Sequence, residues 1–295
     1  MGNVKSRRDA VFGAGSTLFY QEPVHIVRGE GVHLYAADGT RYTDMYNNVP
    51  SVGHCHPHVV AAVSEQLATL NVHNRYLHEA ILVYGERLLA THHAGIEHVV
   101  FSCTGTEANE VALMMARAAT GGQGIICTDA AYHGNSTEVR RLNYCTATTG
   151  DIRGVPFPDL FRFDIQGLGD DPLAYYLEQI ESTIAAFRKD NVPFAGLLFC
   201  PLFANEGLPG IPDGFLPDVA RLVRDAGGLF ICDEVQAGLG RTGRWWGYEV
   251  QGFEPDIVSM GKPLGAGMPL AATAGRRDLV ETFRKKTRYF NTFAS

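Results

Sequence analysis

Residues 227–269 read GGLFICDEVQAGLGRTGRWWGYEVQGFEPDIVSMGKPLGAGMP. Two short apolar runs in this stretch, at 229–232 and 257–260, are each followed by a charged residue. Asp233 comes directly after the first run, and Lys262 follows the second. Because short apolar runs bounded by turn residues are typical of buried strands, we expect a carboxylate and an amine at the tips of two strands. We therefore predict that Asp233 and Lys262 lie at the two ends of one site.

The bulk composition is that of a globular protein with more than one structural layer or subdomain. The 295 residues are 45% hydrophobic and 19% charged, and the formal net charge is −7. Since no strongly basic run is present, neither nucleic acid nor an anionic membrane is expected as a partner. No stretch approaches the roughly 20 apolar residues of a membrane-spanning helix.

The six cysteines indicate free thiols. None of them forms a CxxC motif, and several end or interrupt apolar runs. Buried thiols in a reducing cytosol explain this pattern best, so we expect a cytoplasmic location. The cluster His54-Cys55-His56 invites a metal interpretation. Adjacent residues of an extended chain point to opposite sides, however, and no further ligand is suitably spaced, so no metal site is expected.

Residues 1–56 are expected to form an N-terminal segment with short β-strands. The dipeptide Asp38-Gly39 indicates a hairpin between two of them. The β-rich runs lie at 24–27, 32–35 and 41–43. A helical pattern begins at Pro57, and we predict that 57–295 form one large domain.

Within 57–295, helical and strand patterns alternate. Helices are expected at 79–91, 107–119, 172–188, 215–226 and 277–286. Strands are expected at 99–102, 124–127, 195–200, 229–233, 256–260 and 270–274. The first of these helices should bury Leu82, Val83, Leu88 and Leu89. Residues 143–170 are predicted to be an irregular surface excursion near the site. Apolar strands separated by helices predict an α/β fold with a mostly parallel sheet covered on both faces, and ligands bind at the carboxyl ends of such strands.

Two turns that follow strands, the first of them directly before a helix, carry residues that suit a ligand. Thr104-Gly105-Thr106 offers free amides and a helix dipole that favour a phosphate, and the alternative is a simple N-cap by Thr104 or Thr106. Tyr132-His133-Gly134 follows the next strand, where the aromatic ring could stack on a planar ligand. The alternative is a tyrosine that packs at the sheet edge.

Asp233 and Lys262 add a carboxylate and an amine to these turns. A carboxylate after a buried strand needs a partner or a role, and the alternatives are a helix cap or a salt bridge to Arg241 or Arg244. A partly dry pocket lowers the pKa of an amine toward its nucleophilic form, whereas the alternative for Lys262 is a surface lysine in a Gly-rich loop. A phosphate cradle, a stacking aromatic, a carboxylate and a lysine are together what pyridoxal phosphate requires. An NAD site would need GxGxxG after a strand, which is absent.

Four motifs resemble one enzyme family. They are FICDEVQAGLGRTG, PDIVSMGKPLGAGMPLAA, SCTGTEANEVALMMAR and AYHGN. They are similar to the class III aminotransferases of pyridoxal-phosphate fold type I, and the likeness covers nearly the whole chain. Together with NNV, VGHCHP and LNVHNRYLH, they look nearest to the branch that contains ethanolamine-phosphate phospho-lyase and alanine–glyoxylate aminotransferase. The resemblance implies the large domain of fold type I with pyridoxal 5'-phosphate as cofactor.

The resemblance also implies roles for the residues around the cofactor ring. Lys262 would form a Schiff base with the cofactor and then shuttle protons, and Asp233 would pair with the pyridine nitrogen. Val235 and Tyr132 would lie on the two ring faces, and Gln236 would bind the phenolic oxygen.

For the phosphate, the resemblance implies contacts from Gly105 and Thr106, and from Thr292 of a neighbouring subunit. The active unit would therefore be a homodimer or a higher oligomer. The catalytic residues predicted are Lys262 and Asp233. The predicted cofactor-binding set is Thr104, Gly105, Thr106, Tyr132, His133, Gly134, Asp233, Val235, Gln236, Lys262 and Thr292.

Two departures from the family pattern bear on substrate and activity. Cys200 stands where the family has a glutamate that gates an arginine for substrate carboxylates, so we expect a substrate other than the usual dicarboxylates. The chain stops at Ser295, so we expect the C-terminal small domain to be missing. The function expected is transfer of an amino group from an amino acid or amine to a keto acid or aldehyde. The alternatives are a phospho-lyase for a phosphorylated amino alcohol and an inactive, truncated cofactor-binding or assembly partner.

Overall fold

The computed structural model describes residues 4–18 and 20–293. Its contacts divide the chain into two units, Met1–Leu70 and Asn71–Ser295. This division groups the helix α2 (Pro57–Thr69) with the N-terminal unit. The domain boundary expected between residues 56 and 57 stays a prediction.

The N-terminal unit contains a three-stranded antiparallel sheet. Its elements are α1 (Val4–Phe12), β1 (Ile26–Glu30), β2 (His33–Ala36), β3 (Arg41–Thr43) and α2. The predicted hairpin is confirmed, because Asp38 accepts a hydrogen bond from the Thr40 amide at 2.9 Å and Gly39 takes a φ of +90°. His54 Nε2 lies 2.7 Å from an Asp44 carboxylate oxygen.

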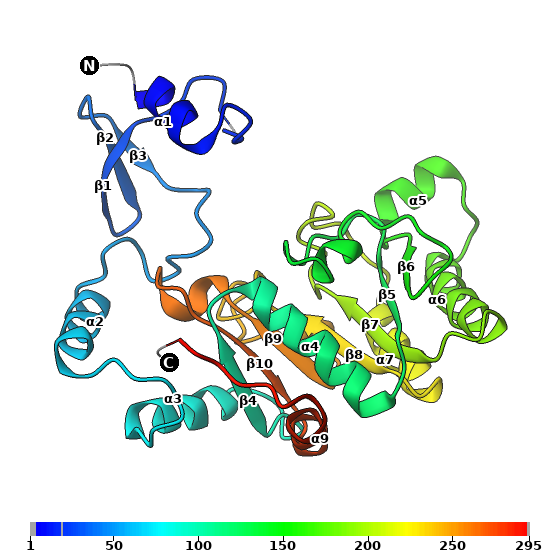
Figure 1. The fold of residues 1–295 in the computed structure, drawn as a ribbon. Coiled ribbons are helices and arrows are strands. Elements are labelled where there is room, and N and C mark those ends of the chain that lie inside the picture. Colours follow the sequence, from blue (N-terminus) through cyan, green and yellow to red (C-terminus); the bar gives the residue numbers. More distant parts are fainter. Residues whose placement is uncertain (1–3, 19, 294–295) are drawn as a thin grey trace. The chain divides into compact units, whose positions relative to one another are not determined.

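Seven strands of the second unit form one sheet, in the order β4-β10-β9-β8-β7-β5-β6 (Figure 1). β10 runs antiparallel to the other six strands, which are parallel to one another, so the predicted α/β fold with a mostly parallel sheet is confirmed. The strands are β4 (His98–Ser102), β5 (Gly124–Thr128), β6 (Ile152–Val155), β7 (Phe194–Phe199), β8 (Leu229–Asp233), β9 (Ile257–Met260) and β10 (Ala271–Gly275).

Helices cover both faces of this sheet. On one face α4 crosses the strands and α9 packs against α4, while α6 and α7 pack together on the other face (Figure 1). The α-helices of the unit are α3 (Glu79–Leu89), α4 (Gly105–Thr120), α5 (Leu160–Gln166), α6 (Pro172–Lys189), α7 (Phe215–Asp225), α8 (Gly247–Gln251) and α9 (Arg277–Thr287). Short 3₁₀ turns lie at Val139–Leu142 and Lys262–Gly265. No helix in the described part of the chain is long and apolar enough to cross a membrane.

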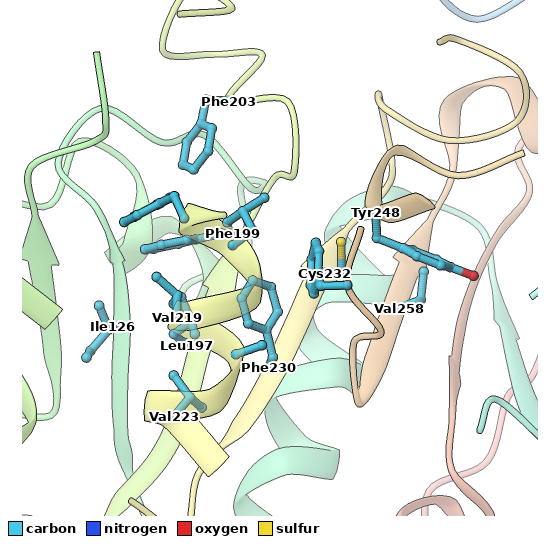
Figure 2. Packing of buried hydrophobic residues seen from close by; sticks show 14 of the residues in the cluster. Ile126, Leu197, Phe199, Phe203, Val219, Val223, Phe230, Cys232, Tyr248 and Val258 are labelled. Atoms are coloured by element: carbon cyan, nitrogen blue, oxygen red, sulfur yellow. The ribbon is translucent and has the colours of Figure 1, made fainter. Parts of the chain in front are cut away.

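The strand β8 shows how the two cores fix the orientation of the site. Its side chains alternate, so Phe230 and Cys232 join the core under α7 (Figure 2), whereas Leu229 and Ile231 join the core under α4. Burial of each large apolar side chain stabilises the fold by about 1.5–3 kcal/mol. A slip of β8 by one residue would move these side chains to the opposite faces, so their burial fixes the register of the strand. The same alternation directs Asp233 to the α4 face.

Two predictions about secondary structure and burial are wrong. Residues 143–170 contain β6 and α5 in place of one irregular stretch. The sequence pattern does not predict β6, because Arg153 puts a charge in the middle of the strand. The structure buries this side chain, which donates to Asp190 at 2.6 Å and lies over the Phe187 ring. In α3, Leu82 and Val83 are exposed, since the helix buries only the face that carries Gly85 and Leu88.

Two adjacent tryptophans provide a matched test of the core. Trp246 is fully buried, stacks on His92 with ring centroids 4.0 Å apart, and donates Nε1–H to the Thr91 carbonyl at 3.0 Å. Its neighbour Trp245 is 56% exposed.

Trp246→Phe is expected to lower the free energy of unfolding by about 2–4 kcal/mol, because it removes buried ring volume and strands the Thr91 carbonyl. The control Trp245→Phe should change it by less than about 0.5 kcal/mol. Urea unfolding of both variants measures the difference. Equal stabilities would contradict this account of the core.

Candidate active site

A cavity of about 180 Å³ lies at the carboxyl edge of the sheet. Its wall brings together nine of the residues predicted from the sequence. It is lined by Gly105, Thr106, Tyr132, His133, Gly134, Asp233, Val235, Gln236 and Lys262, with Cys200 and Asn205 in addition. These residues follow β4, β5, β7, β8 and β9, whose carboxyl ends meet there because the strands run in one direction.

The N-terminus of α4 offers two free amides to the cavity. Thr104 and Glu107 form a capping box, in which Thr104 Oγ1 accepts from the Glu107 amide at 3.1 Å. The Glu107 carboxylate in turn accepts from the amides of Cys103 and Thr104. The remaining first-turn amides, of Gly105 and Thr106, have no acceptor within the helix. They are therefore available to an anion at the positive end of the helix dipole.

Thr104 and Thr292 lie outside the cavity wall. Thr104 acts as the N-cap, which is the alternative considered for this turn. Thr292 is exposed. Its contact with a phosphate held by another subunit stays a prediction.

Close packing at two glycines shapes the cradle around these amides. A Cβ on Gly105 would lie 2.8 Å from Val235 Cγ1, so the turn at Gly105 packs directly on the valine. Gly134 has a φ of +143°, and a Cβ there would lie 2.5 Å from Thr106 Oγ1. Only glycine allows these approaches.

Asp233 is held by donors from three elements. Its Oδ2 accepts from His133 Nδ1 at 2.7 Å and from Asn109 Nδ2 at 2.9 Å, and its Oδ1 accepts from the Val235 amide at 3.0 Å. The residue is only 6% exposed. A buried carboxylate requires such donors, because removing it from water without them is costly.

Lys262 places its amine in the same cavity. Its Nζ donates to Gln236 Oε1 at 2.5 Å. Burial lowers the pKa of the Lys262 amine, although the negative charge of Asp233 opposes this effect. The backbone of Lys262 takes a φ of +21°, which is unusual for a residue with a side chain. A lowered pKa increases the fraction of neutral, nucleophilic amine at neutral pH.

Asparagine side chains hold the loop that contains Tyr132. Asn143 accepts from the His133 amide at 2.8 Å and donates to the Gly134 carbonyl at 2.7 Å. Asn135 donates to the Tyr132 hydroxyl at 2.8 Å, and Asn205 donates to the Tyr132 carbonyl at 3.0 Å. Tyr132 is 38% exposed and lines the cavity.

The sequence reasoning missed Asn109, Ser259, Asn143 and Asn205. Ser259 donates to Asn109 Oδ1 at 2.5 Å, and both side chains are fully buried. The available signal was a polar residue inside an apolar pattern: Asn109 on the inward stripe of a helix and Ser259 in an apolar strand. The loop asparagines carried no such signal.

The described residues fit pyridoxal phosphate. Free amides at a helix start suit its phosphate, a carboxylate suits a protonated pyridine nitrogen, and an amine with a lowered pKa suits its aldehyde. Cys200 adds no charge, because burial, with the nearby Asp233, raises the pKa of its thiol to about 12. No group of three metal-ligating side chains occurs within residues 4–18 and 20–293.

The chain belongs to the class III aminotransferase family, whose model it matches over residues 18–295. It is 35% identical to the alanine–glyoxylate aminotransferase 2-like protein of Drosophila melanogaster, over 97% of this chain and 60% of that protein. It is 34% identical to ethanolamine-phosphate phospho-lyase homolog 1 of Caenorhabditis elegans, over 98% of this chain and 66% of that protein. The chain thus spans less than two thirds of these relatives.

Solved structures show the same fold. A phospholyase from Arthrobacter in complex with phosphoethanolamine has a TM-score of 0.91 and 39% sequence identity, over 99% of this chain and 70% of that chain. A taurine:2-oxoglutarate aminotransferase from Bifidobacterium kashiwanohense, in complex with PLP and glutamate, has a TM-score of 0.85 and 22% sequence identity. The match covers 99% of this chain and 70% of that chain. The second likeness concerns the fold alone.

Glu234, next to Asp233, links the site to α8. Its two carboxylate oxygens accept from the amides of Tyr248 at 2.8 Å and Gly247 at 2.9 Å. Burial raises the pKa of Glu234 to about 7, from an ordinary value of 4.5. The folded protein therefore binds this proton more tightly than the unfolded chain does.

The free energy of unfolding should fall with rising pH through this carboxyl, between about pH 4.5 and about pH 7. Glutamine does not titrate, so the stability of wild type relative to Glu234→Gln should decrease across this window, by about 3 kcal/mol at most. Urea unfolding at a series of pH values measures the slope. Glu178→Gln, at an exposed position, is the control and should keep the pH dependence of the wild type. The prediction is contradicted if Glu234→Gln keeps the wild-type slope as well.

Proposed function

We propose that the protein is a pyridoxal-phosphate-dependent enzyme that transfers an amino group from an amino acid or amine to a keto acid or aldehyde. One observation carries the proposal: the Lys262 amine, the Asp233 carboxylate and the free amides of the α4 N-terminus line one cavity. Membership of the class III aminotransferase family supports the same chemistry.

Each of these groups has a distinct task in that function. When bound, the cofactor supplies an electron-withdrawing ring that stabilises negative charge on the substrate carbon. The amides of Gly105 and Thr106 bind its phosphate, and Asp233 keeps a proton on its ring nitrogen. Lys262 Nζ moves a proton to and from the substrate carbon, and Gln236 holds this amine in place.

A second candidate function is elimination of phosphate from a phosphorylated amino alcohol. Two observations favour it: the similarity to a phospholyase in complex with phosphoethanolamine, and an uncharged thiol at Cys200. Phosphate release from phosphoethanolamine without a keto acid would favour the lyase. Amine transfer that depends on a keto acid would favour the transaminase.

The proposal extends to assembly and compartment. A homodimer is supported by the position of Thr292, which is outside the cavity wall of its own chain. A cytoplasmic location is supported by the six cysteines, all of which are free thiols.

Borohydride treatment in the presence of pyridoxal phosphate is expected to attach the cofactor covalently at Lys262, as read by peptide mass spectrometry. Lys262→Ala should abolish both this attachment and turnover, because no other described amine lines the cavity. The exposed Lys189→Ala should retain both. Absence of attachment in the wild type would contradict both enzyme functions and favour an inactive assembly partner.

Cys200→Glu should change substrate preference. A second carboxylate beside Asp233 would add negative charge to a dry cavity wall, so we expect kcat/KM for the preferred anionic substrate to fall at least about tenfold. Cys200→Ser, which stays neutral, should remain within about threefold. Steady-state kinetics with a panel of amino donors and keto acids measure the effect; an unchanged preference for both would refute the role of Cys200.

A further inference from the structure

Asn109 joins four parts of the site through one side chain. It lies on α4, four residues after Gly105, so both residues occupy the same helix face. Its Nδ2 donates to Asp233 Oδ2 at 2.9 Å and to the His133 carbonyl at 2.8 Å, and its Oδ1 accepts from Ser259 Oγ. The phosphate turn, the Tyr132–Gly134 loop and the tips of β8 and β9 therefore meet at this amide.

The hydrogen bonds determine which way the Asn109 amide faces. Asp233 Oδ2 and the His133 carbonyl are acceptors, so both N–H groups of Asn109 must point toward them. The Ser259 hydroxyl donates to the opposite atom, Oδ1, and so completes the hydrogen bonds of the amide in this orientation. A flipped amide would place an oxygen against two acceptors.

The same bonds distinguish the two oxygens of Asp233. Oδ2 accepts from both Asn109 and His133 Nδ1, which uses its two lone pairs. Oδ1 accepts only from the Val235 amide among the described residues. One lone pair on Oδ1 thus remains for a further donor.

We propose that Asn109 is a positioning residue: its amide fixes the rotation of the Asp233 carboxylate, so that Oδ1 is the oxygen presented to the ring nitrogen of the cofactor. This inference rests on the proposed function for the identity of the ring. Ser259 assists by orienting the Asn109 amide. Because the same amide binds the His133 carbonyl, the carboxylate and the Tyr132–Gly134 loop are set together.

A merely structural role for Asn109 would have different consequences. A buried side chain with three hydrogen bonds also stabilises the fold, so loss of stability alone does not identify a positioning residue. The chain offers a matched control on the same helix. Thr273 of β10 is fully buried and donates Oγ1–H to the carbonyl of Ala108, the residue before Asn109, at 2.7 Å.

The test compares Asn109→Leu, which keeps the size but removes both donors, with Thr273→Val and with Ser259→Ala. The dissociation constant of pyridoxal phosphate is measured by tryptophan fluorescence, and thermal stability by calorimetry. We expect a constant about tenfold higher in Asn109→Leu, two- to threefold higher in Ser259→Ala and unchanged in Thr273→Val. The melting temperature should fall in Thr273→Val as well.

A second measurement needs no cofactor. In ¹⁵N-labelled protein, the imidazole Nδ1–H of His133, which donates to Asp233 at 2.7 Å, reports the position of the carboxylate by its proton chemical shift. This signal should move in Asn109→Leu and Ser259→Ala and stay in place in Thr273→Val. If Asn109→Leu does not fold, Ser259→Ala decides the outcome.

The inference is overturned if the cofactor dissociation constant follows the melting temperature equally in all variants, or if the His133 signal is unmoved in the folded Asn109→Leu or Ser259→Ala protein. A wild-type protein that binds no pyridoxal phosphate would instead refute the proposed function. In that case the His133 signal still shows whether Asn109 positions Asp233.

Discussion

The site depends on one buried carboxylate that must find its donors inside the protein. Asp233 is almost wholly removed from water, and its three hydrogen bonds come from α4, from the loop after β5 and from its own strand end. Each donor compensates part of the desolvation cost. Folding that brings only one of these elements into place would leave the buried charge with a single hydrogen bond. The carboxylate therefore links the formation of the site to the packing of α4 on the sheet.

Burial also explains why neighbouring groups change their acidity in opposite directions. The interior disfavours any charged form, so the pKa of the Lys262 amine falls while the pKa of Glu234 and that of the Cys200 thiol rise. The result is a cavity in which the charge of Asp233 stands beside a neutral thiol and an amine with a reduced tendency to hold its proton. Such a distribution suits a cofactor that brings its own phosphate charge and a protonated ring.

Much of this arrangement could be predicted from the sequence, because its signals are local. Apolar runs that end in a charge place Asp233 and Lys262 at strand tips, and a Thr-Gly-Thr turn marks a helix start. The remainder depends on contacts distant in sequence. Arg153 puts a charge in the middle of β6, so the sequence there does not look like a buried strand. The charge can be buried because the guanidinium group pairs with Asp190 and lies over the Phe187 ring. Asn109 meets Asp233 and Ser259 only because α4 lies across β8 and β9. The residues next to Asn109 in the sequence do not indicate which side chains it will bind.

The contact between Gly105 and Val235 limits how such a site can change. Gly105 and Val235 belong to different βα units, yet a methyl group on Gly105 would lie 2.8 Å from the valine side chain. The two positions therefore cannot vary independently in size. A larger residue at position 105 requires a smaller one at position 235. The smaller side chain would in turn make fewer contacts with a ligand in the cavity. Redesign of the cavity for a bulkier ligand therefore faces a trade-off: space gained at Val235 is lost as contact between the cavity wall and the ligand.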